Sequence, residues 1–481
     1  MIGDLSTVIL VSAVVAWAGL GAVSASHSVM SKRDPRGAAL WVIVSFTLPI
    51  LGPWLYWGFG INRVHRRAIK RLGWRGRSFR AADHAPSTEA VDSIDSVLGH
   101  LKGLDVVGRR LTDMPLAPGN LVEALHNGEE AYPAMLEAIG SARRSVTLGS
   151  YIFDWDEIGR RFTEALGEAA GRGVRVHVLL DGLGAVKAFS RVGRRLIRSG
   201  AEVSAFFPLR FPLGRFRLNL RNHRKIVVVD GSTGFTGGMN ISRKHLAGRA
   251  AADRIEDVHF RIRGPVVGQI QQAFAEDWFL ATDEILSGPA YYPELSAAGS
   301  AWCRGISSGP DEHIGATHRI IHAAIAAAKR EVTMVTPYFI PSRTLIETMG
   351  IAAMGGVEVR VLLPSQVDHR FMGWAADAFL WQLLENGVRV YRQPPPFVHT
   401  KLMIVDRRWV LLGSANVDPR SLRLNFEFNV EAYDGALAEG LSKWLDERIG
   451  RCVVETLAKV DGRSRGVRVR DGFVKMFSPY L

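Results

Sequence analysis

Cysteine is nearly absent from this chain of 481 residues, which contains only Cys303 and Cys452. The two residues lie far apart and outside any zinc-ligand spacing, so the sequence argues against a disulfide framework and against a cysteine zinc site. Clusters of acidic residues at metal-ligand spacing are also missing from the sequence. We therefore expect two reduced, buried thiols and a chemistry that uses no metal and no other cofactor.

Charged residues are absent from two N-terminal stretches, residues 5–26 and 37–62. Each stretch is long enough to cross a hydrocarbon core as a helix, so residues 1–62 are predicted to form a membrane anchor of two transmembrane helices. Signal-peptide cleavage near Ser24 is the alternative for the first stretch, and the lack of an early Lys or Arg argues against it. Pro49 and Pro53 leave open that the second stretch kinks or re-enters, so that only one helix spans.

Basic residues favour one orientation of this anchor. Three of them lie between the stretches, and a larger cluster follows the second stretch within residues 63–80. The larger cluster is expected to stay in the cytoplasm, which places both termini and the rest of the chain on that side.

The formal charge of +13 indicates anionic partners, meaning nucleic acid, acidic lipid or a phosphorylated substrate.

Residues 63–118 are expected to be a basic juxtamembrane segment and a linker. From residue 119 onward, short β-branched runs alternate with helical patterns, which predicts an α/β fold. The pattern occurs twice, so we expect an internal duplication with domains at residues 119–290 and 300–481. Buried strands that correspond between the two copies, each preceded by a helix, are predicted at residues 145–151 and 331–337, and at residues 173–180 and 356–363.

One signature with the spacing H-x-K-x4-D-x6-G-x2-N occurs in each copy. Two accidental occurrences in one chain are implausible, so this pattern carries most of the functional information. The first copy contains His223, Lys225, Asp230 and Asn240, and the second contains His399, Lys401, Asp406 and Asn416.

The residues inside the signature predict a strand that ends in a hairpin, because a β-branched run is followed by Asp230-Gly231. Side chains alternate across a strand, so His223 and Lys225 share one face while Asp230 falls in the turn. The same parity holds in the second copy. Among the eight candidate catalytic residues, we therefore assign the two aspartates mainly to support of the turn.

Two His, two Lys and two Asn brought together across a pseudo-two-fold interface would surround a phosphoryl group with donors. One imidazole can attack phosphorus while the other protonates the leaving oxygen and then deprotonates an incoming alcohol. The lysines and asparagines would neutralise the developing charge without a metal. Asp257 and Glu427 follow the two copies at corresponding places and are the candidates for orienting the imidazoles.

Residues 206–221, just before the first signature, interleave phenylalanines with arginines. We favour an interfacial element that places aromatic rings among lipids while arginines contact phosphates. A grip on single-stranded nucleic acid is the alternative for such a composition. The residues concerned are Phe206, Phe207, Phe211, Phe216, Arg210, Arg215, Arg217 and Arg221.

The doubled signature resembles that of the phospholipase D superfamily, and the chain as a whole is similar to the bacterial membrane-bound cardiolipin synthases. The resemblance rests on the hydrophobic N-terminal pair, both signatures, and matching residues spread along nearly the whole chain, among them Tyr151-Ile152-Phe153, Asp277-Trp278, Tyr338-Phe339, Asp418, Asn425 and Ser478-Pro479-Tyr480-Leu481. It implies two phospholipase D-like α/β/α sandwich domains.

The function that the resemblance implies is a phosphatidyltransferase on the inner face of the bacterial inner membrane. It would convert two phosphatidylglycerol molecules into cardiolipin and glycerol through a phosphatidyl-histidine intermediate, with anionic membrane lipids as partners and no nucleic acid. Arg221, Arg217, Tyr338 and Ser414 are the candidate substrate-binding residues. A homo-oligomer is compatible with the sequence, which does not specify the oligomeric state.

The family usually has Arg where this chain has Glu256, so a headgroup contact made by that Arg is in doubt for this chain. Charge compensation of Glu256 by the basic stretch 242–245 is the simplest explanation.

Three other functions stay open from the residues alone. They are a phospholipase D that hydrolyses lipids, a nuclease of the same superfamily, and a membrane scaffold with an inactive site.

Overall fold

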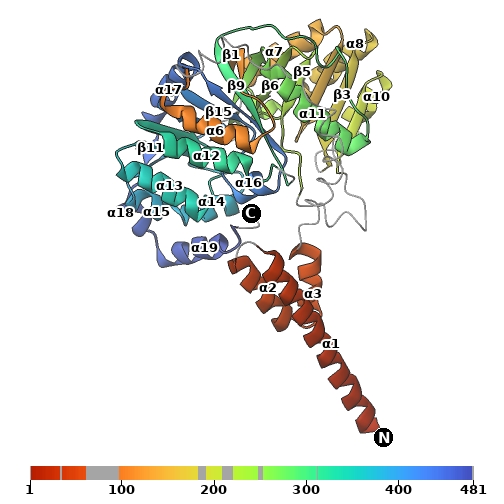
Figure 1. Ribbon diagram of the computed structural model, residues 1–481, viewed down its shortest axis with the longest axis vertical. Helices are drawn as coiled ribbons and strands as arrows, with labels where there is room; N and C mark the ends of the chain where they lie inside the picture. Colours follow the sequence, from red (N-terminus) through yellow and green to blue (C-terminus); the bar gives the residue numbers. More distant parts are fainter. Residues whose placement is uncertain are drawn as a thin grey trace.

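The computed structural model describes residues 2–32, 35–60, 97–182, 191–207, 220–247, 253–310 and 313–478. A slender anchor of N-terminal helices projects from a larger α/β part, which contains the rest of the described chain (Figure 1). The basic cluster of residues 63–80 lies outside the described residues.

The first apolar stretch is one long helix, α1 (Ile2–Ser31). Within it, Thr7–Ser31 is long and apolar enough to cross a membrane, and it is the single segment of the described chain that meets this criterion. The prediction of a hydrophobic N-terminal helix is confirmed, which supports membrane anchoring of the chain.

The second apolar stretch is a helical hairpin instead of one long helix. α2 (Pro35–Thr47) ends before Pro49, and α3 (Leu51–Leu55) continues into the π-helical turn η1 (Tyr56–Gly60). Gly52 lets the chain fold back, because a Cβ atom at this position would collide with the Val44 carbonyl group. The Trp41 and Tyr56 rings then meet at 5.5 Å. With 13 residues, α2 is about 20 Å long, short of the ~30 Å hydrocarbon core.

Fifteen of the described strands form one mixed sheet whose order is nearly palindromic, and the short strands β7 (Ile255–Glu256) and β13 (Phe397–Val398) pair separately. From one edge inward the order is β4-β3-β2-β5-β6-β8-β1, and from the other it is β12-β11-β10-β14-β15-β16-β9, with β17 added outside β12. The strands are β1 (Ala117–His126), β2 (Ser145–Ser150), β3 (Arg175–Asp181), β4 (Glu202–Phe206), β5 (Ile226–Val229), β6 (Thr233–Gly237), β8 (Val258–Arg263), β9 (Ala301–Ser308), β10 (Glu331–Val335), β11 (Glu358–Pro364), β12 (Arg389–Gln393), β14 (Leu402–Val405), β15 (Trp409–Gly413), β16 (Glu427–Tyr433) and β17 (Val453–Val454).

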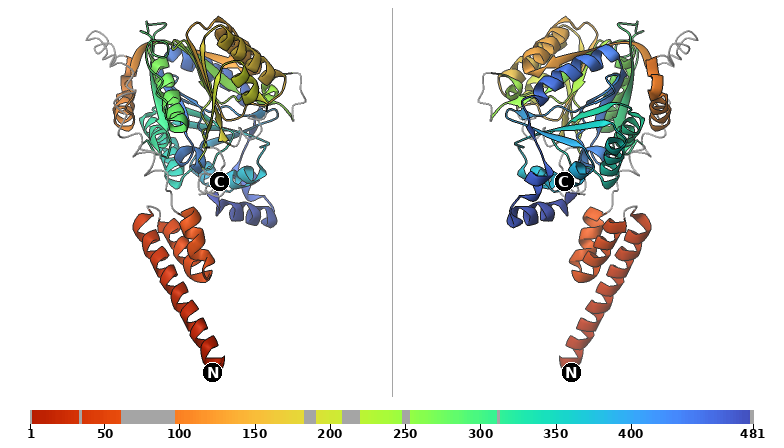
Figure 2. Two further views of the ribbon diagram at one scale, coloured as in Figure 1. Left: turned by 90° about the vertical axis from the view of Figure 1, so that its right-hand side faces the viewer. Right: turned by 90° about the vertical axis from the view of Figure 1, so that its left-hand side faces the viewer.

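Helices pack on this sheet, or on one another, along its whole width (Figures 1 and 2). They are η2 (Gly99–Leu101), α6 (Lys102–Leu111), α7 (Asn127–Ser141), α8 (Glu157–Gly171), α10 (Val192–Arg198), η4 (Arg243–His245), α11 (Val266–Thr282), α12 (Ala316–Ala327), α13 (Arg343–Met354), α14 (Arg370–Asp377), α15 (Leu380–Glu385), α16 (Pro419–Arg423), α17 (Gly435–Ile449), α18 (Leu457–Asp461) and α19 (Arg465–Lys475).

The strands predicted from the duplicated pattern are confirmed. β2 pairs in parallel with β3, and β10 pairs in parallel with β11. A helix precedes each of them: α7, α8, α12 and α13 in chain order. The hairpins predicted from the two signatures are also present, as β5 with β6 and β14 with β15.

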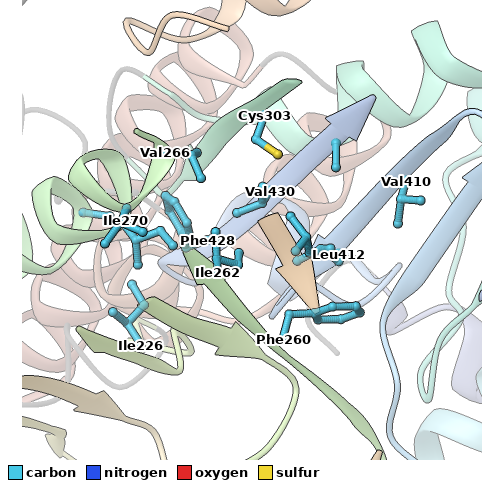
Figure 3. Packing of buried hydrophobic residues seen from close by; sticks show 14 of the residues in the cluster. Ile226, Phe260, Ile262, Val266, Ile270, Cys303, Val410, Leu412, Phe428 and Val430 are labelled. Atoms are coloured by element: carbon cyan, nitrogen blue, oxygen red, sulfur yellow. The ribbon is translucent and has the colours of Figure 1, made fainter. Parts of the chain in front are cut away.

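One hydrophobic core is shared by the two halves of the sheet. It joins Ile226 and Phe260 of the first half to Leu412, Phe428 and Val430 of the second. These side chains lie together beside α11, which contributes Val266 and Ile270 (Figure 3). Because this core is continuous, the inner edges of the two halves are held in fixed register.

The end of the expected linker belongs to the folded part. Leu98, Leu101 and Leu104 are buried in the core of the second half, where α6 packs against α12. The polar composition of residues 97–111 had predicted a linker. The buried leucines show instead that this segment covers one face of the second half.

Candidate active site

Both signature histidines lie where the two halves of the sheet meet. The backbone N–H of His223, just before β5, donates to the Phe426 carbonyl of the second half at 2.9 Å. The backbone N–H of His399, just before β14, donates to the Glu256 carbonyl of the first half at 2.8 Å. The parallel pair of β7 (Ile255–Glu256) and β13 (Phe397–Val398) extends the second contact. The backbone of each half therefore positions the histidine of the other.

The two carboxylates expected to orient the histidines also bond across this interface. His223 Nδ1 lies 3.0 Å from Glu427 Oε2, and His399 Nδ1 lies 2.9 Å from Asp257 Oδ2. Both carboxylates are buried. A proton shared at Nδ1 leaves Nε2 of each ring as the atom with a free lone pair. The sequence had indicated the two carboxylates, and the structure adds that each serves the histidine of the opposite half.

Burial governs the protonation of these pairs. It lowers the pKa of His223 to about 4, although Glu427 opposes the shift. Burial likewise lowers the pKa of His399, assisted by Lys401. Burial also disfavours a charged Asp257, but the hydrogen bond and charge of His399 outweigh it and lower the pKa of that carboxyl to about 2. The carboxylates are thus ionised and the imidazoles neutral near pH 7 before an anion binds.

The signature lysines lie beside the histidines. Lys225 Nζ donates to the His223 carbonyl at 2.7 Å, and Lys401 Nζ donates to the His399 carbonyl at 2.5 Å. Burial lowers the pKa of Lys225 to about 7 and that of Lys401 to about 8, against the opposing charges of Glu427 and Asp257. Each lysine also lowers the pKa of the histidine in the other half, so the four side chains share one electrostatic environment.

The signature asparagines stand in different environments. Asn240 Oδ1 accepts from the Ile152 backbone N–H at 3.2 Å, which leaves the amide N–H groups of Asn240 as donors. Asn416 is buried, and its Oδ1 atom has no hydrogen-bond partner within the part of the chain that the structure describes. Both residues lie three positions after the second strand of a hairpin, Asn240 after β6 and Asn416 after β15, at the same edge of the sheet as the histidines.

Asp230 and Asp406 do not belong to this cluster. Both have a φ of 52° in the turns after β5 and β14. The Asp230 carboxylate accepts backbone N–H groups of Arg143, Arg144 and Ser145, and Asp406 accepts those of residues 329–331 together with His100 Nε2. A strand of four residues, about 13 Å long, separates each aspartate from its histidine. Both aspartates therefore lie apart from the histidines, and their contacts agree with the turn-supporting role expected from the sequence.

Two of the expected substrate-binding residues, Ser414 and Tyr338, make different contacts in the structure. The buried hydroxyl of Ser414 donates to Glu427 Oε2 at 2.6 Å and accepts from the Phe428 backbone N–H at 3.0 Å. It therefore supports the carboxylate and is closed to substrate. The Tyr338 hydroxyl donates to Asp368, while its ring lies 6.3 Å from that of Phe397.

Arg221 is buried immediately before the first signature. Its Nη1 atom lies 3.7 Å from Asp181 Oδ1, and within the described residues its guanidinium nitrogens have no hydrogen-bond partner. Guanidinium N–H groups without a partner can donate hydrogen bonds to the oxygens of an incoming phosphate. Arg217 lies outside the described residues, as do Phe211 and Phe216.

The phenylalanines at the start of the segment 206–221 are part of the core. Phe206 is fully buried at the end of β4, and its ring lies 5.0 Å from that of Phe426. Phe207 packs against Phe206 at 4.4 Å. For Phe206 the expectation of a ring that inserts among lipids is wrong, because the strand directs it into the core shared by the two halves. Phe207 follows the strand and is half-buried against the same core.

Glu256 takes part in the contact between the halves. Arg448 Nε donates to Glu256 Oε1 at 2.9 Å, and Gln393 Nε2 donates to Oε2 at 3.1 Å. Compensation by the basic stretch 242–245, expected from the sequence, is therefore wrong. The charge of Glu256 is balanced by a helix of the second half, which strengthens the same interface that positions His399.

Sequence reasoning missed a second group of residues around the site. Arg224 donates to Asp277 Oδ1 at 2.9 Å and to Ser307 Oγ at 2.6 Å, which anchors the first signature to α11 and β9. His245 and His259 are buried close to Asp257, and the His245 ring lies 6.3 Å from that of His399. Burial lowers the pKa of His245 to about 3 and that of His259 to about 4. The string Arg221-Asn222-His223-Arg224, which overlaps the signature, was the signal available for Arg224.

One group of side chains in the described residues has the composition of a metal site. The ligand atoms of His177, Glu202 and Glu284 lie within 4.8 Å of one another, and both glutamates are exposed. The group lies near the start of β3, whereas the signature histidines lie near the ends of the parallel strands. It therefore has no part in the site built by the two signatures.

Family models match most of the folded chain. The model described as "Cardiolipin synthase, PLD-like domain" matches residues 135–278 and 321–449, one segment in each half of the sheet. The model described as "Phospholipase_D-nuclease N-terminal" matches residues 14–60, which include most of the helical anchor.

Curated relatives extend this similarity over nearly the whole chain. A protein named cardiolipin synthase A from Pseudomonas fluorescens is 34% identical over 439 residues, which are 89% of each chain. A cardiolipin synthase from Geobacillus kaustophilus is 31% identical over 454 residues, covering 94% of this chain and 90% of the relative. The crystal structure of a phosphatidylserine synthase from Haemophilus influenzae shares the fold, with a TM-score of 0.61 and 16% identity over 79% of this chain and all of that chain.

Proposed function

Because the chain belongs to the family of cardiolipin synthases with phospholipase D-like domains, we propose that it condenses two phosphatidylglycerol molecules into cardiolipin and glycerol. The observation that carries this proposal is the pair of crossed contacts, His223 to Glu427 and His399 to Asp257. They provide two oriented imidazoles with free Nε2 atoms in one shared site, which is what a double displacement at phosphorus requires.

The two halves, residues 119–290 and 300–481, are proposed to be phospholipase D-like α/β/α domains related by a pseudo-two-fold axis. The palindromic strand order supports this relation, since β1 and β9 meet at its centre. Residues 97–111 then belong with the second domain, on which they pack. An axis between the domains places one histidine, one lysine and one asparagine on each side of a bound phosphate.

The first half-reaction is proposed to transfer a phosphatidyl group to His223. The Nε2 atom attacks phosphorus, and the bond from phosphorus to the glycerol oxygen breaks. His399, which takes up a proton from solvent when the anionic phosphate binds, gives that proton to the glycerol oxygen. The Asp257 carboxylate holds His399 by its Nδ1 atom and stabilises the protonated form. Glycerol leaves, and the phosphatidyl group stays on His223.

The second half-reaction is proposed to reverse these roles with a new alcohol. A hydroxyl group of the second phosphatidylglycerol gives its proton to His399, and the resulting oxygen attacks phosphorus. The phosphorus–nitrogen bond breaks, which releases cardiolipin and restores both histidines. Lys225, Lys401, Asn240 and Asn416 are proposed to hold the phosphoryl oxygens, and Arg221 and Tyr338 to contact the headgroups.

Full-length protein in phosphatidylglycerol vesicles tests the proposed reaction. We expect cardiolipin and glycerol to appear in equal amounts, which lipid chromatography and an enzymatic glycerol assay would measure. Phosphatidic acid in place of cardiolipin would make the chain a hydrolase. Cleavage of added DNA without any lipid product would make it a nuclease, and no product at all would favour an inactive scaffold.

We infer that α1 alone crosses the membrane and that the hairpin of α2 and α3 re-enters from the side of the α/β part. Trp57 Nε1 donates to Ser24 Oγ, and Ser28 Oγ donates to the Ala38 carbonyl, so the hairpin packs along the C-terminal half of α1. A single crossing also puts the basic residues 32, 33 and 36 on the same side as the cluster 63–80, in agreement with the positive-inside rule. The α/β part is then cytoplasmic, and the N-terminus lies on the opposite face.

An epitope tag fused to the N-terminus tests this topology. We expect external protease to remove the tag once the outer membrane is permeabilised, while the inner membrane stays intact. A second tag at the C-terminus serves as the control and should survive until the inner membrane is broken. Protection of both tags would show that the anchor crosses twice.

A further inference from the structure

The last helix, α19, and the two residues that follow it expose a row of large apolar side chains. The exposed fractions are 72% for Val469, 60% for Phe473, 72% for Met476 and 48% for Phe477. The Phe473 and Phe477 rings lie 5.3 Å apart. We call these four residues the outer face of α19. Apolar groups gathered in this way on a short helix are costly in water and indicate a binding surface.

The other side of α19 holds the helix against α14. Val474 and Asp471 are buried there, the Arg470 guanidinium lies 4.3 Å from the Trp374 ring centroid, and Lys475 Nζ lies 4.3 Å from that of Phe379. The outer face is therefore fixed in orientation by packing on its opposite side.

Two further kinds of exposed residue occur on α19 and on α14, the helix against which it packs. Phe371 of α14 adds a ring that is 61% exposed. Arg465 and Arg468 of α19 are also exposed, so cations flank the apolar row. An amphipathic helix with apolar residues at its centre and basic residues at its border is typical of proteins that lie on anionic lipid surfaces.

A series of ring contacts connects this region to the proposed active site. The His399 ring lies 6.0 Å from that of Phe397, which lies 6.3 Å from that of Tyr338. Tyr338 donates to Asp368, two residues before α14 begins. The outer face and the second signature thus belong to the same edge of the sheet, where β11 ends.

The anchor lies on this side of the molecule as well. In all three views, α19 is at the end of the α/β part that faces the helical anchor (Figures 1 and 2). A bilayer that contains α1 would extend sideways beneath α19. This position favours a lipid surface over a soluble protein as the occupant of the outer face.

We propose that the outer face of α19, together with Phe371, docks on the surface of an anionic bilayer and inserts its apolar side chains below the headgroups. Docking brings the site edge of the second half to the lipid surface, so that phosphatidylglycerol reaches the histidines without leaving the membrane. This inference rests on the proposed lipid substrate, but docking is a physical contact that can be measured without turnover.

A spin label on the outer face tests the contact directly. The full-length Phe473→Cys chain would carry a nitroxide in a Cys452→Ser background, since Cys303 is buried. In vesicles of phosphatidylglycerol and phosphatidylethanolamine, we expect the label to collide readily with oxygen and poorly with a water-soluble nickel complex. A label at Ile351→Cys on α13, an apolar residue that is 66% exposed, is the matched control and should stay in water.

Three results of the spin-label measurement would decide whether the outer face docks on lipid. A label at residue 473 that is as accessible to nickel as the label at residue 351 would overturn the proposal. Spin–spin coupling that disappears on dilution with unlabelled chain would also overturn it, because a second copy would then cover the face. Insertion without any cardiolipin formation would support docking and refute the proposed reaction, so the two hypotheses fail separately.

Activity gives a second readout that does not depend on labelling. We expect the variant with serine at residues 469, 473, 476 and 477 to lose about tenfold in cardiolipin formation on vesicles, equivalent to ~1.4 kcal/mol of interfacial binding. In detergent-dispersed phosphatidylglycerol its rate should match that of the unaltered chain, which also shows that it is folded. Serine at Ile351 and Met354, both exposed on α13, is the matched control and should leave both rates unchanged. Equal losses on vesicles and in detergent would contradict docking.

Discussion

Replacing His223 with alanine is expected to abolish cleavage of a phosphatidyl donor, with a loss of at least ~10⁴-fold, because this removes the proposed nucleophile. Replacing His399 should have a different effect. That variant lacks the proton donor for departing glycerol, but it keeps the atom that attacks phosphorus. The two histidines have similar surroundings, so only a substrate that separates the two half-reactions can tell them apart.

Phosphatidyl-p-nitrophenol is such a substrate, because its leaving group departs without a proton. With this donor, His399→Ala should release nitrophenol in a burst of about one equivalent and retain an acid-labile phosphatidyl group on the chain. His223→Ala should give neither burst nor adduct. Rapid absorbance measurement and mass spectrometry of the intact protein would detect both signals.

His322→Ala is the matched control for these variants. His322 lies on α12, and its Nδ1 atom is 2.9 Å from Thr348 Oγ1, away from both signatures. It should retain normal turnover and accumulate no adduct. A burst and an adduct in His223→Ala, with neither in His399→Ala, would reverse the assignment of nucleophile and acid.

Local sequence patterns were sufficient to predict the strands and hairpins that position the histidines. The run of β-branched residues before Asp230-Gly231 carries its structural preference within a few residues, and the same is true of the second copy. The turn role of the aspartates followed from the same parity. In the structure these carboxylates accept three backbone N–H groups in each half.

Tertiary contacts decided the features that the sequence did not reveal. The ring of Phe206 fits an interfacial segment by composition, yet its place at the end of β4 puts it against Phe426, more than 200 residues later. Likewise, Ser414 resembles an exposed turn hydroxyl until Glu427 is placed beside it. Neither partner can be deduced from residues nearby in the sequence.

The path of the N-terminal anchor was also not predictable from local sequence, although the residues in contact are closer together in the chain. The lack of charge between residues 37 and 62 fits one straight crossing, and the prolines show only that the stretch can bend. The return of the chain depends on Gly52 passing close to the Val44 carbonyl and on Tyr56 reaching His27, where the hydroxyl lies 2.6 Å from Nδ1. Such contacts between helices are not encoded in hydropathy.

The crossed pairing of carboxylates and histidines leads to a second large effect. Glu427→Gln removes the acceptor that keeps the His223 proton on Nδ1, because the amide can donate there and force the proton onto Nε2. A loss of about 10²- to 10⁴-fold is expected for both Glu427→Gln and Asp257→Asn. Glu123→Gln, at a surface ion pair with Arg261, is the matched control and should be almost unchanged.

The phosphatidyl-p-nitrophenol burst then reveals which histidine each carboxylate serves. Glu427→Gln should lose the burst, although Glu427 lies in the second half, because its partner is the nucleophile of the first half. Asp257→Asn should keep the burst and turn over slowly, since its partner His399 acts on the departing and incoming oxygens. If each carboxylate served the histidine of its own half, the two results would be exchanged. The burst therefore tests whether the site requires both halves, because neither half alone holds a histidine together with the carboxylate that orients it.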